Sequence, residues 1–316
     1  MLIRNRLDEL PALGTPLHLA LGMFDGVHIG HQAVITRAVA AAARSGGVAG
    51  VVTFDPHPER LLAPDKAASA VLTTLAHKGR IVEQLGAGLF VPVHFDAALA
   101  QLEAEEFFQQ LLAAPIRTLA VGEDWRFGRG RRGDVEFLRA RAVAAGFELA
   151  TVAPVMVDGE RVSSTRIRQA VRDGSLEAAA RMLGRPYAVS GKVVEGRKLG
   201  RQLGFATANV AIGEELTPPD GVWAVRVAVV GGEVRPGVAN LGVRPTVDGS
   251  NRVLEVHLFD FSGDLYGREI EVTFVRFLRP EQRFASLDLL RGQIAVDAAT
   301  ACQWLASDIL TAEETP

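Results

Sequence analysis

The sequence has little cysteine and no long apolar run. Its single cysteine, Cys302, permits no internal disulfide and no cysteine-rich metal cage, which fits a reducing compartment. No stretch of about 18 or more apolar residues occurs, and the first residues, MLIRNRLDELPALG, carry charges where a secretory signal needs its apolar core. We therefore expect a soluble, untargeted protein of the cytoplasm.

The sequence also lacks a basic excess. Its 316 residues include 34 lysines and arginines against 37 aspartates and glutamates, for a net charge of −3. A general binder of nucleic acid or of a membrane surface is expected to carry a strong positive excess. Repeats and low-complexity segments are missing too, apart from alanine-rich helical stretches. With 48% apolar and 22% charged residues the chain reads as globular, and its length predicts two domains of about 100–200 residues.

Short apolar runs alternate with helical patterns in the first half of the chain. Runs of this kind without polar alternation are typical of strands buried on both faces. Their alternation with helices predicts right-handed crossovers and a parallel sheet covered on both faces. We therefore expect a doubly wound α/β domain, with strands at 17–22, 48–54, 88–95, 117–122 and 147–152 and helices at 31–45, 75–85, 103–112 and 134–145.

The pattern changes at Gly184-Arg185-Pro186, after two short helices expected at 165–172 and 175–182. Beyond this point polar and apolar residues alternate, which indicates half-buried antiparallel strands, with Gly231-Gly232 as a candidate hairpin turn. A small closed barrel hides the edges of such strands. We expect domains at 1–184 and 185–316. The second has strands at 187–194, 222–230, 252–261 and 268–278 and a packed helix whose apolar stripe is Leu287, Leu290, Ile294, Ala298, Ala301, Leu305 and Ile309.

The segment GMFDGVHIGHQ (22–32) joins the first strand to the first helix, where open α/β sheets bind ligands. The helix N-terminus suits a phosphate. His28 and His31 share one helix face and could both donate hydrogen bonds to a phosphoryl centre. The alternatives are that one histidine caps the helix while the other is solvated, or that the pair binds a metal together with Asp25. Three glycines allow tight turns and close approach of a ligand, namely Gly22, Gly26 and Gly30.

The string G-x-F-D-G-x-H-x-G-H-Q resembles the H-x-G-H signature of nucleotidyltransferases, in the form found in bacterial FAD synthetases. The resemblance extends to TFDPHP (53–58), VGEDWRFGRG (121–130) and SSTRIR (163–168), each at the carboxyl end of an expected strand. It implies that ATP binds here and that the last segment closes over its phosphates through Ser164, Thr165 and Arg168. Taken alone, that last segment also fits an ordinary N-cap.

Other residues of these segments are candidates for nucleotide or flavin contacts. Trp125 and Phe127 could stack on an isoalloxazine ring, or could pack down onto the sheet. His57 lies between two prolines and fits a rigid turn as well as a ligand contact. The predicted binding residues of this half are Gly22, Phe24, Asp25, Gly26, Gly30, His57, Asp124, Phe127, Ser164, Thr165 and Arg168, with His28 and His31 as the catalytic pair.

The segment GKVVEGRKLGRQLGFATAN (191–209) is rich in glycine and basic residues. Such a loop can present backbone N–H groups to phosphates, although the P-loop spacing is absent. Alternatively, it is a long hairpin loop with solvated Arg197, Lys198 and Arg201. Its end resembles the G-x-P-T-A-N motif of the riboflavin kinase module that bacterial FAD synthetases carry, with Ala206 in place of proline. The candidate ATP-binding residues here are Gly191, Lys192 and Gly204.

The same resemblance assigns chemistry to the barrel. It implies that Thr207 and Asn209 coordinate the Mg²⁺ of ATP, while the loss of proline at Ala206 removes a fixed φ and is expected to loosen the loop. The segments ANLGVRPTVDG (239–249) and RVLEVHLFDF (252–261) match the rest of the module. Glu255 would then be the general base that activates the ribityl 5′-hydroxyl. The competing interpretation pairs this strand carboxylate with Arg252 or Arg268.

Together the motifs predict a bifunctional enzyme of FAD biosynthesis. It would use ATP and Mg²⁺ to phosphorylate riboflavin to FMN, and a second ATP to adenylylate FMN, giving FAD and pyrophosphate. Neither step needs a protein nucleophile. The expected partners are small-molecule flavins and ATP, not nucleic acid or membrane. Two alternatives are a nucleotidyltransferase with a weakened kinase half and an RNA-binding protein like an aminoacyl-tRNA synthetase, which would show a basic face and stacking aromatics on the barrel.

Overall fold

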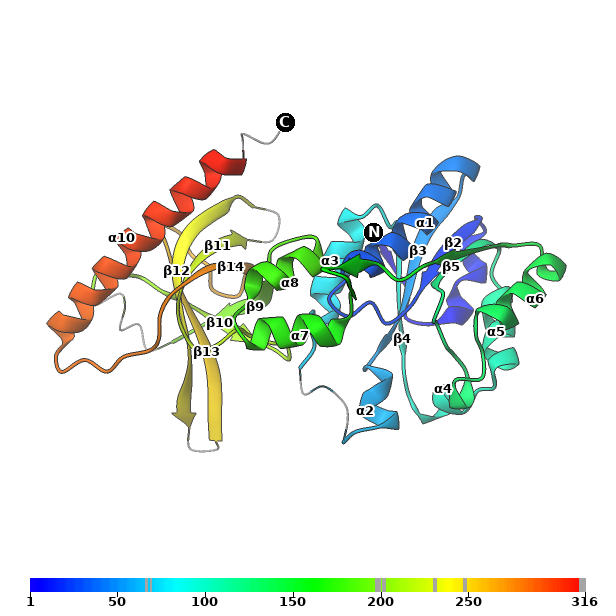
Figure 1. Cartoon of the computed structure of the whole chain (residues 1–316), viewed down its shortest axis with the longest axis horizontal. Coiled ribbons are helices and arrows are strands. Elements are labelled where there is room, and N and C mark those ends of the chain that lie inside the picture. Colours follow the sequence, from blue (N-terminus) through cyan, green and yellow to red (C-terminus); the bar gives the residue numbers. More distant parts are fainter. Residues whose placement is uncertain are drawn as a thin grey trace. The chain divides into compact units, whose positions relative to one another are not determined.

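Figure 1 shows the computed structural model of the chain. It describes residues 1–65, 68, 70–196, 200, 203–229, 232–246 and 249–312, of which 244–246, 249–251 and 308–312 are described by their backbone alone. The chain forms two compact units, Met1–Ser164 and a second that begins at Thr165.

The first unit contains a six-stranded sheet with the order β1-β4-β3-β2-β5-β6, and all its strand pairs are parallel. From β2 the chain builds the sheet outward on one side with β3 and β4, and then on the other side with β5 and β6. In open α/β sheets, ligands bind at such a reversal, outside the carboxyl ends of the strands. The strands are β1 (Leu2–Ile3), β2 (Leu17–Leu21), β3 (Val48–Asp55), β4 (Leu89–His94), β5 (Ile116–Gly122) and β6 (Glu148–Val152).

Two apolar clusters show that helices cover both faces of this sheet. Along β2, Leu17, Leu19 and Leu21 belong to a cluster with side chains of α5 and α6, whereas Ala20 belongs to a second cluster with side chains of α1 and α3. This alternation is that of a strand buried on both sides. The predicted doubly wound α/β architecture is confirmed, with helices α1 (Ile29–Ser45), α3 (Leu75–Gln84), α5 (Ala104–Leu112) and α6 (Val135–Ala145).

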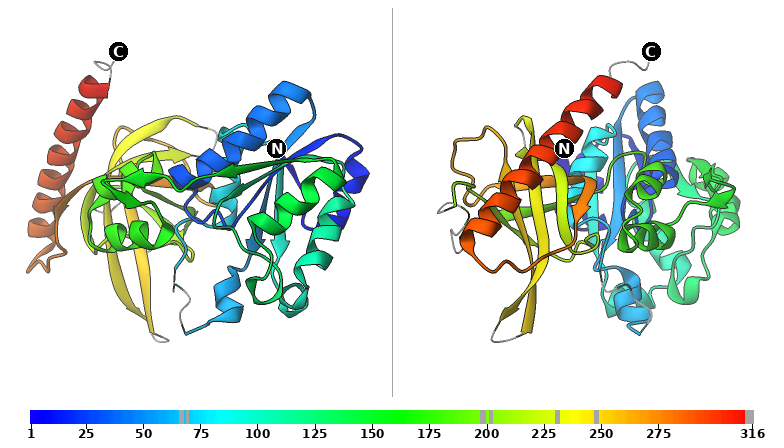
Figure 2. Two further views of the ribbon diagram at one scale, coloured as in Figure 1. Left: turned by 45° about the vertical axis from the view of Figure 1, so that its right-hand side comes forward. Right: turned by 60° about the vertical axis from the view of Figure 1, so that its left-hand side comes forward.

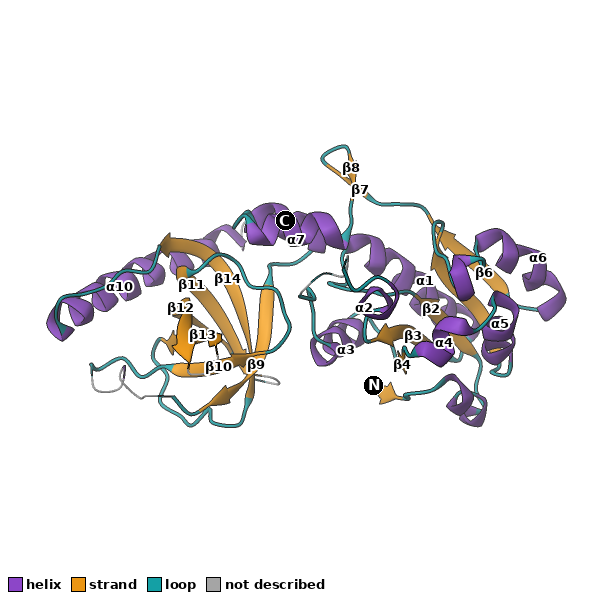
Figure 3. Cartoon of the chain, turned by 90° about the horizontal axis from the view of Figure 1, so that it is seen from below, coloured by secondary structure: helices purple, strands orange, loops and turns teal. Residues whose placement is uncertain are grey.

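Several short elements of the first unit were not predicted, because they are too short for hydrophobic periodicity to show. Figure 3 shows the two-stranded ribbon of β7 and β8 standing apart from the main sheet. Besides β1, these elements are α2 (Pro58–Leu62), α4 (Ala97–Gln101), β7 (Met156–Val157), β8 (Glu160–Arg161) and the 3₁₀ segments η1 (Leu7–Glu9), η2 (Pro11–Leu13) and η3 (Arg129–Arg131).

The second unit is a closed antiparallel barrel with the order β10-β13-β12-β11-β14-β9. The predicted hairpin is confirmed, because β11 pairs with β12 and the Gly232 N–H donates to the Val229 carbonyl at 2.7 Å; Gly231 lies outside the described residues. β10 and β12 were not predicted, the first being short and the second containing proline and glycine. The strands are β9 (Ala188–Val194), β10 (Ala208–Ile212), β11 (Gly221–Val229), β12 (Val234–Thr246), β13 (Gly249–Leu258) and β14 (Glu269–Arg279).

The two short helices follow the prediction as α7 (Ser164–Arg172) and α8 (Leu176–Leu183), but they group with the barrel. The compact units therefore divide at Ser164, earlier in the chain than the change of sequence pattern near Gly184. The domain boundary at Gly184 stays a prediction.

The C-terminal helix α10 (Leu287–Ala312) packs on the barrel and runs along its wall in Figure 2. Ala301 and Leu305 are buried against apolar side chains of β11 and β12, as the predicted stripe requires. The start of that stripe does not pack, since Leu287 is 57% exposed. The side chain of Ile309 lies outside the described residues.

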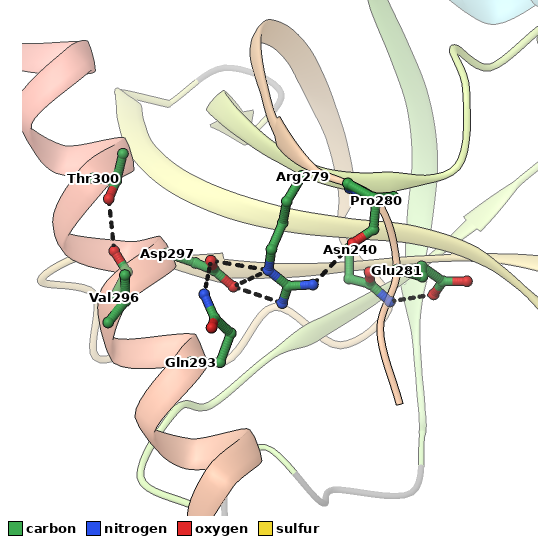
Figure 4. Close-up of polar contacts among 8 residues, drawn as sticks. All are labelled: Asn240, Arg279, Pro280, Glu281, Gln293, Val296, Asp297 and Thr300. Carbon is green, nitrogen blue, oxygen red and sulfur yellow. Dashed lines mark hydrogen bonds and ion pairs between the residues drawn. The ribbon is translucent and has the colours of Figure 1, made fainter. Parts of the chain in front are cut away.

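Polar contacts complete the docking of α10. Figure 4 shows Asp297 of α10 facing Arg279 at the end of β14, whose Nε and Nη2 donate to the carboxylate at 3.0 and 2.7 Å. Gln293 Nε2 donates to the same carboxylate at 2.9 Å. The Arg276 guanidinium lies 4.2 Å from the ring centroid of Trp304. The helix is thus held by ionic and cation–π contacts as well as by its apolar face.

Candidate active sites

The loop after β2 leads directly into α1, whose N-cap is His28. The Nδ1 atom of His28 accepts a hydrogen bond from the His31 backbone N–H at 3.3 Å. In this contact Nδ1 of His28 is the acceptor. His28 therefore caps the helix, as the alternative interpretation expects, but His31 is not the solvated residue of that alternative, because its Nδ1 is buried.

The two imidazole rings are stacked, with centroids 3.5 Å apart and planes at 17°. Phe24 meets His31 edge-on at 5.4 Å. Burial lowers the pKa of His31 well below its usual value, and the charges of His28, Lys78 and Arg161 lower it further. Within the described part of the chain, Nδ1 of His31 is buried and makes no hydrogen bond. The pair is thus a preformed group of stacked imidazole rings at a helix N-terminus.

Other predicted residues of the loop hold its shape. Both carboxylate oxygens of Asp25 accept from the Leu72 N–H, at 2.9 and 3.2 Å, and one also accepts from the Thr73 N–H at 3.3 Å. A Cβ at Gly22 would lie 2.9 Å from the Phe24 ring, so that ring needs a glycine beneath it. Of the remaining two glycines, Gly26 has φ of 78° and Gly30 lies against the His28 ring.

The predicted residues after β3 and β5 are also at strand carboxyl ends. His57 caps α2 and its Nδ1 accepts from the Glu59 N–H at 3.3 Å, as the turn interpretation expects. Asp124 forms an ion pair with Arg161 of β8. Phe127 is buried among Phe107 and Phe137.

Trp125 is the outer member of the aromatic pair. Its ring stacks on Phe127 with centroids 4.6 Å apart and planes at 17°. Trp125 is half-buried, whereas Phe127 is 7% exposed. Any flat ligand at this loop would therefore meet Trp125 more fully than Phe127.

Ser164 connects the start of α7 to the first loop, because its Oγ donates to the Asp25 carbonyl at 2.9 Å. Thr165 and Arg168 follow on the same helix, the first exposed and the second half-buried.

Among the described residues, no group of three or more His, Cys, Asp and Glu side chains is placed to hold a metal, so nothing supports the metal alternative for His28, His31 and Asp25.

In the barrel, strand register brings the predicted residues into one row. Glu255 of β13 lies opposite Asn209 of β10 and opposite Asn240 of β12. The neighbours of Glu255 on its strand, Leu254 and Val256, are fully buried, so Glu255 lies on the opposite face of β13. Cross-strand neighbours of this kind have Cβ atoms about 4.5–5.5 Å apart. Asn209 and Glu255 are therefore direct neighbours on one face of the barrel wall.

The loop before β10 packs tightly on Thr207 and Asn209. A Cβ at Gly196 would overlap the Asn209 side chain, and one at Gly200 would overlap the Phe205 carbonyl and lie 3.0 Å from Thr207 Oγ1. Threonine and asparagine offer the hard oxygen ligands that Mg²⁺ prefers, so the residues present fit that ion. Of the predicted ATP-binding residues, Gly191 is buried in β9, Lys192 beside it is exposed, and Gly204 has a positive φ of 89°. The basic residues of the loop lie outside the described residues, namely Arg197, Lys198 and Arg201.

Two residues that extend this row were not predicted. Asn240 Nδ2 donates to Glu281 Oε1 at 3.0 Å, which places a second carboxylate beside the row (Figure 4). The competing partner of Glu255, Arg252, bonds Thr217 and Asp220. The resemblance of the segment ANLGVRPTVDG (239–249) to the riboflavin kinase module could have suggested Asn240, but no local sequence pattern indicates Glu281.

Both halves of the chain match known families. The model described as FAD synthetase matches residues 12–166, and the model described as riboflavin kinase matches residues 183–305. The alternatives of an RNA-binding protein and of a degraded kinase half are therefore not favoured. Among the described residues, no helix is both long and apolar enough to cross a membrane.

Similarity to individual proteins covers nearly the whole chain. A bifunctional riboflavin kinase/FMN adenylyltransferase of Escherichia coli (strain K12) is 45% identical over 94% of this chain and 95% of its own length. That of Pseudomonas fluorescens is 42% identical over 89% and 90%. A crystal structure described as a macrolide-efflux protein from Streptococcus pneumoniae shares the fold, with a TM-score of 0.79, 30% identity and coverage of 94% of this chain and 96% of that one. The chain belongs to the family of bifunctional riboflavin kinase/FMN adenylyltransferases.

Proposed function

We propose that the two reactions of this family take place at the two sites described above. Riboflavin is phosphorylated to FMN in the barrel, and FMN is adenylylated to FAD at the loop after β2. The observation that carries this division is the pair of separate constellations, one around the stacked His28 and His31 rings and one around the Asn209–Glu255 row.

In the adenylyl-transfer site, a phosphate oxygen of FMN attacks the α-phosphorus of ATP, and the bond to the bridging oxygen breaks to release pyrophosphate. Negative charge develops on the oxygens of the α-phosphate. The Nε2–H of His28 and the ring of His31 stabilise this charge by hydrogen bonds, beside the positive end of the α1 dipole. The buried, unbonded Nδ1 of His31 supports this role, since such an atom is costly unless a ligand satisfies it.

The remaining residues of this half bind the two substrates. Ser164, Thr165 and Arg168 hold the ATP phosphates. The glycines of the loop leave room for the nucleotide, and Phe24 and Asp25 shape its backbone. On the flavin side, Trp125 offers a ring face to the isoalloxazine while Phe127 supports Trp125 from below. Asp124 and His57 border the same edge of the sheet.

In the barrel, Glu255 acts as the general base and takes the proton of the ribityl 5′-hydroxyl as that oxygen attacks the γ-phosphorus of ATP. Thr207 and Asn209 would hold Mg²⁺ through their side-chain oxygens. Bound Mg²⁺ neutralises phosphate charge. The backbone around Gly191, Lys192 and Gly204 contacts the ATP phosphates. ADP leaves with the remaining two phosphates.

The cellular location and the partners of the enzyme follow from the same chemistry. Flavins and ATP are small soluble substrates, and the free thiol of Cys302 is exposed, so we place the enzyme in the cytoplasm. We expect no nucleic acid or membrane partner. We place the domain boundary between the adenylyltransferase and kinase halves near Gly184.

The proposal is tested with purified protein, riboflavin, ATP and Mg²⁺, followed by chromatographic separation of riboflavin, FMN and FAD. The wild-type chain should form both products. His28→Ala combined with His31→Ala should accumulate FMN, with adenylylation lowered by at least about 100-fold. Glu255→Gln should lose riboflavin phosphorylation by about 10²–10⁴-fold and still convert supplied FMN to FAD.

A matched control is Glu233→Gln, which removes an exposed carboxylate elsewhere on the barrel and should change neither activity. Equal loss of both activities in either active-site variant would contradict two separate sites.

A further inference from the structure

The loop between Gly22 and His28 has an uncommon backbone. Phe24 and Val27 both have positive φ, 49° and 41°. This region is sparsely populated by residues with a Cβ, and a β-branched residue such as Val27 is an outlier there. Such a conformation persists only where surrounding groups impose it. Because His28 follows directly, the groups that hold the loop also place the histidine pair.

The segment just before α3 supplies part of this support. The Gly26 N–H donates to Thr73 Oγ1 at 3.1 Å, and the backbone N–H groups of Leu72 and Thr73 bind the Asp25 carboxylate. The loop is therefore fastened at two of its residues by a segment remote from it in sequence.

Lys78 of α3 fastens the loop at a third residue. Its Nζ donates to the Met23 carbonyl at 2.8 Å and lies 3.3 Å from Thr53 Oγ1. Thr53 Oγ1 donates to the same Met23 carbonyl at 2.8 Å. Met23 immediately precedes the positive-φ residue Phe24, so this contact acts where the chain turns out of β2.

The Lys78 side chain is buried, with the residue 6% exposed. Burial lowers the pKa of its ammonium, and the nearby carboxylates of Asp25 and Asp55 act in the opposite direction. A buried charge is costly unless it is hydrogen-bonded and compensated by opposite charge. The two oxygen acceptors and the two nearby carboxylates supply that compensation for Lys78.

We propose that Lys78 is a positioning residue for adenylyl transfer: its buried ammonium fixes the Met23 carbonyl and with it the loop that presents His28 and His31. The proposal rests on the adenylyl-transfer site proposed above. Lys78 acts through the loop and needs no contact with the substrate.

A second effect of Lys78 gives the test a readout besides activity. The groups that lower the pKa of His31, besides burial, are His28, Lys78 of α3 and Arg161 of β8. Removing the Lys78 charge takes away one of these contributions. The pKa of His31 should therefore rise in a variant that keeps the size of the side chain and loses its charge.

The experiment uses the full chain with Lys78→Met, which keeps the aliphatic stem. Displacing a catalytic group by about 1 Å can cost about 100-fold in rate, so we expect kcat/KM for FMN adenylylation to fall by about 10–100-fold. Riboflavin phosphorylation by the same protein should stay within about twofold, which serves as an internal control for folding. The His31 ring should titrate at higher pH by NMR, with its resonance assigned from His31→Asn.

Thr53→Val keeps the Lys78 charge and removes one hydroxyl from the Met23 carbonyl. It should lower adenylylation less than Lys78→Met and leave the pKa of His31 unchanged. Gln84→Met, an exposed position at the end of the same helix, is the matched control and should change neither activity.

Adenylylation by Lys78→Met within about threefold of wild type would overturn the proposal, as would an unchanged pKa of His31. If Lys78→Met also loses kinase activity, Thr53→Val decides: lowered adenylylation with intact phosphorylation supports the proposal, and unchanged adenylylation overturns it. Failure of the proposed site itself is distinguishable, because it would appear as full adenylylation by His28→Ala combined with His31→Ala.

Discussion

The Nδ1 atom of His257 donates a hydrogen bond to the Ala206 carbonyl at 2.8 Å. The same ring meets Phe205 edge-on at 5.4 Å and is itself packed against Phe259. His257 lies two residues beyond Glu255 on the same face of β13. One strand thus carries the proposed base and fastens the loop that leads to Thr207, at the position where alanine replaces the proline of the motif.

His257→Phe should therefore weaken the kinase half. The substitution keeps an aromatic ring and removes a hydrogen bond worth about 1 kcal/mol, which corresponds to roughly a fivefold rise in KM for ATP. Ala206→Pro should restore part of the loss, because proline restricts the same backbone. Steady-state kinetics of riboflavin phosphorylation measures both, with FMN adenylylation as the control. An unchanged KM would show that the loop does not depend on His257.

The low pKa of His31 predicts how stability depends on pH. An unfolded imidazole titrates near pH 6.5, whereas the folded ring stays neutral to lower pH. Below about pH 6.5 the unfolded chain binds more protons than the folded one, so the free energy of unfolding falls as pH falls. His31→Asn should flatten this dependence. Calorimetric Tm values of both proteins between about pH 5.5 and 7.5 check this, and parallel slopes would contradict it.

The ion pair between Arg279 and Asp297 predicts a large stability effect. Both side chains are largely buried, at 16% and 7% exposure. Removing one partner of a buried pair costs about 3–5 kcal/mol, because the other charge stays behind. Asp297→Ala should lower the free energy of unfolding by that amount and increase amide hydrogen exchange in α10. Asp288→Ala, exposed on the same helix, should have little effect.

The double substitution Arg279→Met with Asp297→Leu extends this prediction. It removes both charges and keeps apolar volume, so it should cost less than Asp297→Ala alone. A double variant that is less stable than the single one would show that the pair contributes more than mutual charge neutralisation.

The division of the chain predicts a difference between two C-terminal fragments. Residues 165–316 retain α8, in which Ala179, Met182 and Leu183 are buried, and residues 185–316 do not. Both fragments contain the barrel site, so both should phosphorylate riboflavin. The shorter one should unfold at lower temperature, because it lacks the stabilisation that burial of these side chains contributes, about 1.5–3 kcal/mol for each large one. Equal Tm values would place the folding boundary at Gly184.

Local patterns were sufficient for much of the fold. Continuous apolar runs predicted the buried strands 17–22 and 48–54, which the structure has as β2 and β3, because burial on both faces leaves no room for polar alternation. Glycine after Ser45 and threonine before Leu75 marked helix ends, because capping depends on adjacent residues. The H-x-G-H string placed the histidine pair at the start of α1, after the loop that follows β2.

What the sequence by itself determined, then, is the class of each unit, the family and the position of His28, His31 and Glu255 on their elements. Only the tertiary structure decided which residues meet. Strand register brings Asn240 beside Glu255, and Asn240 in turn binds Glu281. Lys78 reaches Met23 from another segment, and Asp297 pairs with Arg279. Each of these joins residues far apart in the chain, and a charged residue on a helix gives no local sign of whether it faces water or a distant partner.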